Sequence, residues 1–249
     1  YLMRYETELG RSDVFLENVR TGLGMLRAMD SLMQQASDVL KRVKVLVQQA
    51  ANGTLTAEDR QTIAAEVRQL REQMVVIGNS SFNGKFLFNG QKTDQAPYTI
   101  ANAANEATDD GVYYLNVSPS IQVPVSLQGE FIFGAAGDPE NTFKILDDII
   151  NHLENNDVDG LRTALDRMVV AEERIYSAWA EIGARTNRFE LVENRILDEQ
   201  VSLHRLKSET GDVDMADAII QLKLQENTLQ AALATGARIM QVSLVDFLK

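Results

Sequence analysis

Few residues in this sequence have side chains suited to acid–base or metal chemistry. The chain has two histidines, His152 and His204, and no cysteine, so it offers no thiolate nucleophile and no disulfide. Neither histidine has a second His or Cys close to it in sequence, so the usual ligand spacing of a metal site is absent. The adjacent carboxylates Asp147 and Asp148 face different directions on a helix, so they do not form a catalytic pair. We expect no catalytic centre, no metal and no cofactor.

One glycine-containing stretch, NSSFNGKFLFNGQKTDQAPYT at residues 79–99, is a further candidate for ligand binding. Lys85 follows a glycine there, but the spacings of phosphate-binding and dinucleotide-binding loops are both absent. Asn-Gly steps are typical of tight turns instead. We therefore expect this stretch to turn the chain from a helix into short strands. Its hinge residues, with the two aromatic rings packed at the join, are Gly84, Phe86, Phe88 and Gly90.

Long helices are predicted on both sides of this stretch. Between residues 22 and 50, apolar residues recur at alternating steps of four and three, which is the seam of a coiled-coil-like helix. Asn52-Gly53 ends that helix, and Thr56 followed by Asp59 forms a capping box that begins the next one. Two helices joined by so few residues form an antiparallel hairpin.

Helical spacing returns after residue 140. It predicts a short helix over 141–153 and a long one over 161–209. Thr210-Gly211 is expected to break the long helix, and Asp212 to cap a separate last helix.

The last helix, residues 212–249, carries an unusually apolar stripe for a chain end. Exposed apolar patches of this kind mark interaction sites, so we expect this helix to be the assembly element. Its predicted interface residues are Ile219, Leu222, Leu229, Leu233, Met240, Leu244 and Phe247.

Between residues 91 and 140 the hydrophobic period changes. All four prolines of the chain lie here, together with the β-branched and aromatic segments YTIA, GVYYLNV, IQVPVSL and EFIFG. Such segments are typical of strands, and Pro124 indicates an edge strand. The patterns together predict a mainly α fold, a rod-like bundle of long coiled-coil-like helices. Residues 1–90 and 141–249 form this α-helical domain, and 91–140 a small β-rich inserted domain.

The net charge of the chain makes some classes of binding partner unfavourable. A formal net charge of −12 disfavours nucleic acid and anionic membranes, because phosphate groups would be repelled. There is no run of 18 apolar residues, so we expect no membrane span. The chain starts at Tyr1 inside a helical pattern, and we expect a preceding N-terminal segment to be missing.

Two segments near the ends resemble the flagellin family. LKRVKVLVQQAANGT, residues 40–54, is similar to the end of the family's first long helix, and residues 212–249 are similar to its C-terminal segment over their whole length. The stretch GKFLFNGQKTDQAPY, residues 84–98, resembles the hook-associated members of the FlgL type. The resemblance covers essentially the full chain.

This resemblance implies a non-enzymatic structural protein, secreted through the flagellar export channel and located outside the cell at the hook–filament junction. The implied partners are the neighbouring hook-associated junction protein, flagellin and copies of the chain itself in a ring. An export chaperone would bind the C-terminal helix before secretion. In this family the N-terminal segment pairs with the C-terminal helix, and roughly the first 40–50 residues of that arrangement are expected to be absent here.

Two alternatives stay open. The first is a divergent filament flagellin that polymerises by itself. Flagellins typically have Glu at the position of Val45, on a surface used in filament packing, and its replacement argues against self-assembly. The second is an enzyme carried on residues 91–140, which contain no His or Cys and have their carboxylates mostly in expected loops.

Overall fold

The computed structural model describes the backbone of residues 2–247 and the side-chain environment of 2–211 and 215–237. Four helices dominate it: α1 (Leu2–Ala50), α2 (Ala57–Gly78), α4 (Thr142–Glu154) and α5 (Val158–Phe247). The shorter elements are β1 (Ser81–Phe82), β2 (Lys85–Phe86), η1 (Ala103–Asn105), β3 (Tyr114–Ser118), β4 (Ile121–Pro124) and α3 (Gly129–Phe133). The predicted mainly α fold of long helices is confirmed, and the region where a small β-rich insertion was predicted contains a small two-strand sheet.

The chain divides into two compact units. The larger unit is Phe15–Arg195, and the smaller unit combines Tyr1–Val14 with Ile196–Lys249. Residues 91–140 lie inside the larger unit, so the division does not fall at the expected boundaries. Whether 91–140 fold by themselves stays a prediction.

The heptad seam of α1 is buried as predicted. Every seam residue from Gly22 to Ala50 is buried, because residues three and four apart lie on one face of a helix. Gly22 is needed where the seam meets α5, since a Cβ there would lie 2.4 Å from Cε1 of Phe189. The helix ends at Ala50, just before Asn52-Gly53, as expected.

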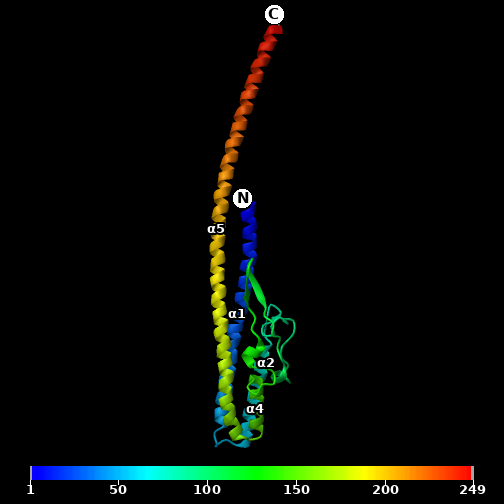
Figure 1. Ribbon diagram of the computed structural model, residues 1–249, viewed down its shortest axis with the longest axis vertical. Coiled ribbons are helices and arrows are strands. Elements are labelled where there is room, and N and C mark those ends of the chain that lie inside the picture. Colours follow the sequence, from blue (N-terminus) through cyan, green and yellow to red (C-terminus); the bar gives the residue numbers. More distant parts are fainter. Residues whose placement is uncertain (1, 248–249) are drawn as a thin grey trace. The chain divides into compact units, whose positions relative to one another are not determined.

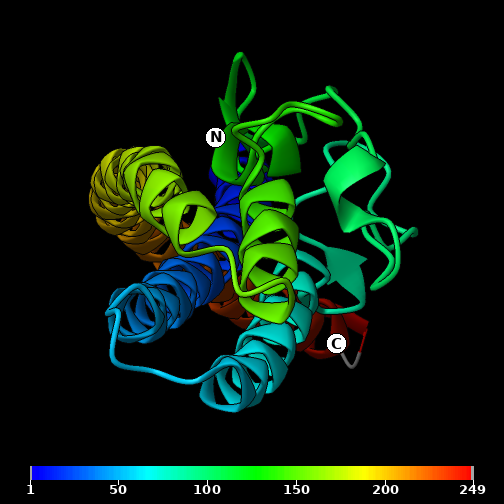
Figure 2. The same cartoon turned by 90° about the horizontal axis from the view of Figure 1, so that it is seen from below.

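In the larger unit, α1, α2, α4 and the first part of α5 lie side by side (Figure 2), and α2 packs against α4 (Figure 1). Polar contacts accompany the α1–α5 seam. Trp179 Nε1 donates to Asp30 Oδ1 at 2.5 Å, and Lys44 Nζ lies 2.8 Å from Glu172 Oε2. The core between these helices is apolar, with Phe143, Phe189 and several methionines fully buried.

The predicted capping box at the start of α2 is present. Asp59 N donates to Thr56 Oγ1 at 3.2 Å, and Thr56 N donates to Asp59 Oδ2 at 3.1 Å. The pKa of Asp59 lies below its ordinary value because the Thr56 side chain and backbone amide hydrogen-bond its carboxylate. A lowered folded-state pKa stabilises the fold above the unfolded pKa, and this stabilisation is lost as pH falls through the folded pKa.

Replacing Thr56 by Ala is expected to lower the free energy of unfolding of the larger unit by about 1 kcal/mol, because α2 loses a side-chain cap. Urea unfolding followed by circular dichroism measures the change. Thr62→Ala is the matched control, since Thr62 is exposed within the same helix and caps nothing. Equal effects of the two substitutions would contradict the capping role.

The predicted break at Thr210-Gly211 is wrong. α5 continues through both residues as one helix of 90 residues, so 212–247 is the end of α5 and not a separate helix (Figure 1). Gly within a helix costs only about 1 kcal/mol relative to Ala, which packing can offset. Leu2 of α1 packs there, since a Cβ at Gly211 would lie 3.5 Å from Leu2 Cδ2.

Residues 91–140 contain less strand than predicted. GVYYLNV and IQVPVSL do supply β3 and β4, which pair antiparallel with Leu115 opposite Val123. YTIA is not a strand, and the first four residues of EFIFG lie in the short helix α3. In YTIA both backbone hydrogen-bonding groups of Tyr98 bond to the side chain of Asn79. Asn79 Nδ2 donates to Tyr98 O at 2.6 Å, and Tyr98 N donates to Asn79 Oδ1 at 2.9 Å.

Candidate functional site

The two histidines lie in different environments. His152 Nδ1 lies 2.8 Å from Asp157 Oδ2, and Asp157 Oδ1 accepts from Gly160 N at the start of α5. His204 is exposed on α5. Among the described residues, no group of three His, Cys, Asp or Glu side chains is placed to hold a metal ion. Within the same part of the chain, no helix is long and apolar enough to cross a membrane.

The predicted hinge stretch leads into an aromatic cluster in the larger unit. Phe88 is fully buried, and its ring centroid lies 6.4 Å from that of Phe133 in an edge-to-face arrangement. Tyr98 packs edge-to-face on Phe133 at 5.7 Å and lies 4.9 Å from Phe143. Burial raises the pKa of the Tyr98 hydroxyl. The cluster therefore joins residues 79–99 and α3 to α4.

The other predicted hinge residues have different environments. Phe86 is only partly buried, and its backbone N–H donates to Thr93 O at 2.8 Å. Gly84 is exposed with φ of 76° in the turn between β1 and β2. Gly90 is buried with φ of 56°, and a Cβ there would lie 2.4 Å from Asp109 O. The structure thus brings Phe88 and Gly90 into the core, and a hinge role for the four residues stays a prediction.

Arg71 of α2 also holds the loop region, and the sequence patterns did not single it out. Its side chain is 8% exposed, and its Nε donates to Asp147 Oδ1 of α4 at 2.5 Å. Its Nη1 donates to the carbonyl of Ile100 in the loop region. An arginine next to the apolar face of a helix is the one local signal for this contact. These contacts of Arg71 hold the loop region against α2 and α4.

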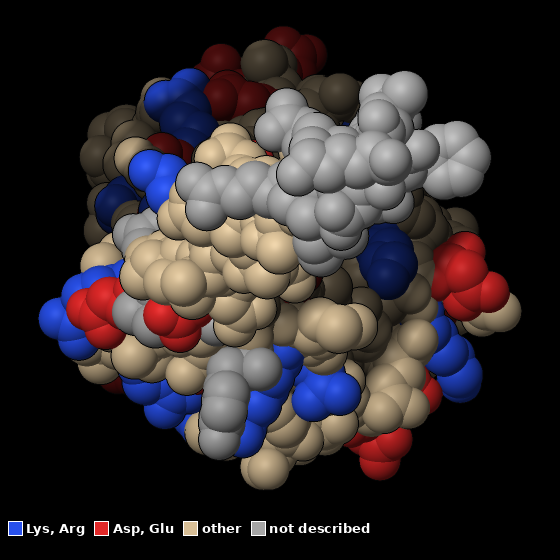
Figure 3. Space-filling view, turned by 90° about the horizontal axis from the view of Figure 1, so that it is seen from above, with Lys and Arg blue, Asp and Glu red and all other residues tan. Residues whose placement is uncertain are grey.

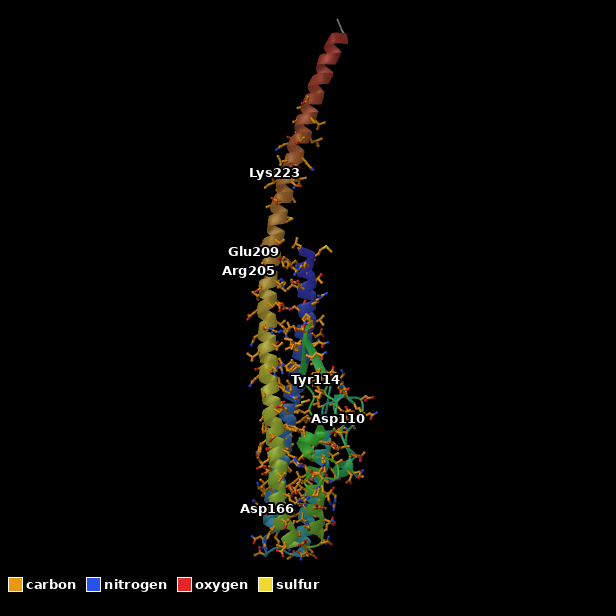
Figure 4. All side chains as sticks on the ribbon, in the orientation of Figure 1. Asp110, Tyr114, Asp166, Arg205, Glu209 and Lys223 are labelled. Atoms are coloured by element: carbon orange, nitrogen blue, oxygen red, sulfur yellow. The ribbon has the colours of Figure 1, made fainter. Side chains whose placement is uncertain are left out.

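Four of the predicted assembly residues lie on an exposed part of α5. Every described side chain from residue 215 to 237 is exposed, and Lys223 in Figure 4 lies in this part. We call four of its apolar side chains, which are between 50% and 65% exposed, the assembly face: Ile219, Leu222, Leu229 and Leu233. The neighbouring Ile220 and Leu224 are 57% and 60% exposed.

Three further predicted interface residues, Met240, Leu244 and Phe247, lie outside the residues whose side chains the structure describes. Figure 3 looks onto the molecule from above, with residues of uncertain placement in grey. Side chains other than Lys, Arg, Asp and Glu cover much of this view, and both acidic and basic groups are visible at its margins (Figure 3).

In the smaller unit, the part of α5 that lies beside α1 differs from the exposed assembly face. Lys207 Nζ lies 2.9 Å from Glu6 Oε1 of α1, and Gln200 Nε2 donates to Asp13 Oδ1 at 2.8 Å. The apolar side chains buried in this unit include Leu9, Ile196 and Leu203. Side chains of α5 are therefore covered where α1 runs beside it, whereas the assembly face has no such cover within the described residues.

The sequence matches two family descriptions. Residues 4–93 match the bacterial flagellin N-terminal helical region, and residues 165–248 match the bacterial flagellin C-terminal helical region. The two matches together span well over half of the chain.

Individual flagellar proteins are also similar to this chain in sequence or fold. Flagellar hook-associated protein 3 of Escherichia coli (strain K12) is 24% identical, covering 88% of this chain and 76% of that protein. Flagellin of Bacillus subtilis (strain 168) is 28% identical, covering 90% of this chain and 76% of the flagellin. The solved structure of flagellar hook-associated protein-3 from Legionella pneumophila matches the fold with a TM-score of 0.74 and 15% identity, covering 86% of this chain and all of that one.

Proposed function

Since the chain belongs to the bacterial flagellin family, we propose that it is a structural protein of the bacterial flagellum that joins the hook to the filament without catalysis. The observation that carries the proposal is the match to flagellar hook-associated protein 3, which covers 88% of this chain. The stretch GKFLFNGQKTDQAPY, with its resemblance to hook-associated members, supports the junction over the filament.

The assembly face is the proposed contact surface. Leucine and isoleucine side chains that are half or more exposed favour association, because burying each one removes apolar area from water. Their spacing places them on one face of α5, as in a helix that packs against a neighbouring helix. The partners that suit this face are flagellar subunits: the neighbouring hook-associated junction protein, flagellin, and copies of this chain in a ring.

The same face also needs protection before assembly. An exposed apolar helix aggregates unless it is covered, so an export chaperone bound to the end of α5 suits a protein that is secreted through the flagellar channel. The proposed final location is extracellular, at the hook–filament junction.

A filament flagellin is the second candidate, and the 28% identity to Bacillus subtilis flagellin favours it. Against it stands Val45, which is 53% exposed on α1 where flagellins typically have Glu. The replacement of Glu by Val at position 45 therefore lies on the surface of the larger unit, where it alters the contacts that a packed filament would make.

Deleting the gene for this chain tests the junction function. We expect electron micrographs to show intact hooks without filaments, and immunoblots to show filament protein released into the medium. A plasmid copy of the gene is expected to restore filaments. Loss of the filament protein itself from both cells and medium would instead identify the chain as the filament flagellin.

Purified protein provides an independent comparison. A junction protein stays monomeric when filament seeds are added, whereas a flagellin elongates them. Seeded growth, followed by light scattering, would overturn the junction proposal and support the second candidate.

A further inference from the structure

The sequence repeats one tripeptide in two different environments. Phe-Asn-Gly occurs at residues 82–84 and again at 88–90, followed by Lys and Gln respectively. Because the two local sequences are nearly the same, any difference in their chemical reactivity comes from the fold.

The first copy forms an exposed turn. Phe82 pairs with Lys85, which leaves Asn83 and Gly84 as a two-residue turn with φ of 50° and 76°. Positive φ at both positions is the type I′ hairpin turn. Both residues are exposed, and a Cβ on Gly84 would meet no atom within 4 Å. Among the described residues, the Asn83 side chain has no hydrogen-bond partner.

The second copy is enclosed. Asn89 is 6% exposed, and both ends of its amide are held: Nδ2 donates to Gln95 O at 3.0 Å, and Oδ1 accepts from Asp109 N at 3.0 Å. A Cβ on Gly90 would lie 2.4 Å from Asp109 O and 2.6 Å from Gly111 O. The amide of Asn89 therefore cannot turn towards the following backbone nitrogen without breaking these contacts.

We propose that Asn83 is a site of spontaneous deamidation, and that the fold protects Asn89 from the same reaction. The Gly84 nitrogen attacks Cγ of Asn83, a new C–N bond closes a succinimide ring, and the Cγ–Nδ2 bond breaks. The amide proton of Gly84 leaves with Nδ2 as ammonia. Water then opens either ring carbonyl to give aspartate or isoaspartate, so the net change is asparagine plus water to acid plus ammonia.

The residue types and their exposure favour this reaction at Asn83. Glycine has no Cβ to hinder the approach of its nitrogen, and asparagine is among the heat-labile residues of proteins. The modification adds one negative charge to the formal −12 of the chain. It also occurs beside a packed contact, since a Cβ on Gly24 of α1 would lie 2.8 Å from Cζ of Phe82.

The test compares the deamidation rates of Asn83 and Asn89 within one sample. The folded chain is incubated in mildly alkaline buffer at physiological temperature, and peptide mapping by mass spectrometry quantifies aspartate and isoaspartate at Asn83 and Asn89. We expect conversion at Asn83 to be at least about tenfold faster, because Asn89 reacts only after local opening. In denaturant, where the fold no longer separates them, the two sites should react at similar rates.

Two results would overturn the proposal: equal rates at the two sites in the folded chain, or an Asn83 that reacts in denaturant but stays intact when folded. An Asn83→Gln variant adds a second readout, because a glutamine side chain does not close the five-membered ring readily. Asn52-Gly53 is another exposed Asn-Gly step, so its acidic product should remain in every variant. The incubated folded Asn83→Gln chain should lose the further early acidic species that arises at residue 83 on ion-exchange chromatography, whereas Asn89→Gln should keep it. The Asn83→Asp variant marks where the direct product elutes.

Discussion

Replacing Leu229 or Leu233 by Asp is expected to abolish incorporation at the hook–filament junction while leaving thermal unfolding of the isolated chain nearly unchanged. The two side chains are 62% and 65% exposed, so a carboxylate at either position stays in water and disturbs no core. In an assembled interface the same carboxylate would be buried without a partner, which is strongly unfavourable. Immunoblots of purified hook complexes measure incorporation, and calorimetry measures unfolding.

Asn227→Asp is the matched control for this experiment. Asn227 is exposed on the same part of α5 but faces away from Leu229, and its substitution adds the same single charge. It is expected to incorporate normally. If Leu229→Asp instead lowers the temperature of the cooperative unfolding transition, the side chain belongs to a folded core and the assembly face is wrongly assigned.

Replacing Phe88 by Ala is expected to lower the free energy of unfolding of the larger unit by roughly 3–5 kcal/mol, the usual cost of emptying a buried aromatic site. The ring is fully buried and contacts Phe133, so its loss leaves a cavity between the loop region and the helices. Denaturant unfolding monitored by circular dichroism measures the change.

Phe131→Ala provides the comparison for Phe88. Phe131 is 47% exposed in α3, so the same truncation leaves little cavity and is expected to change stability by less than about 1 kcal/mol. Similar losses for Phe88 and Phe131 would show that the aromatic cluster does not join the loop region to the helices.

Much of the helical structure could be predicted from the sequence. The seam from Gly22 to Ala50 and the capping box of Thr56 and Asp59 depend on residues three or four apart, so the local pattern contains the information. The segments of β3 and β4 could be predicted for the same reason, because strand alternation is also local, whereas their pairing is seen only in the structure. Of the candidate site, the apolar positions of the assembly face were visible as helical periodicity, and their exposure agrees with an unpaired helix.

Other elements could not be predicted because distant residues decide them. EFIFG has the composition of a strand, yet Ile132 and Phe133 are adjacent and both fully buried, which suits a helix turn and not a one-sided strand. YTIA lacks strand partners because the Asn79 side chain takes both backbone groups of Tyr98. The continuity of α5 through Gly211 likewise involves Leu2, a residue far away in sequence.

By itself, then, the sequence determined the long helices, their buried seams and the apolar face near the end of α5, since helical periodicity follows from the covalent order of the residues. Only the tertiary structure decided which aromatic rings meet around Phe133, that Arg71 holds the loop region, and which of two Phe-Asn-Gly copies is open to water. The physical reason is that these properties depend on contacts and burial created by residues far apart in the chain, which no local spacing records.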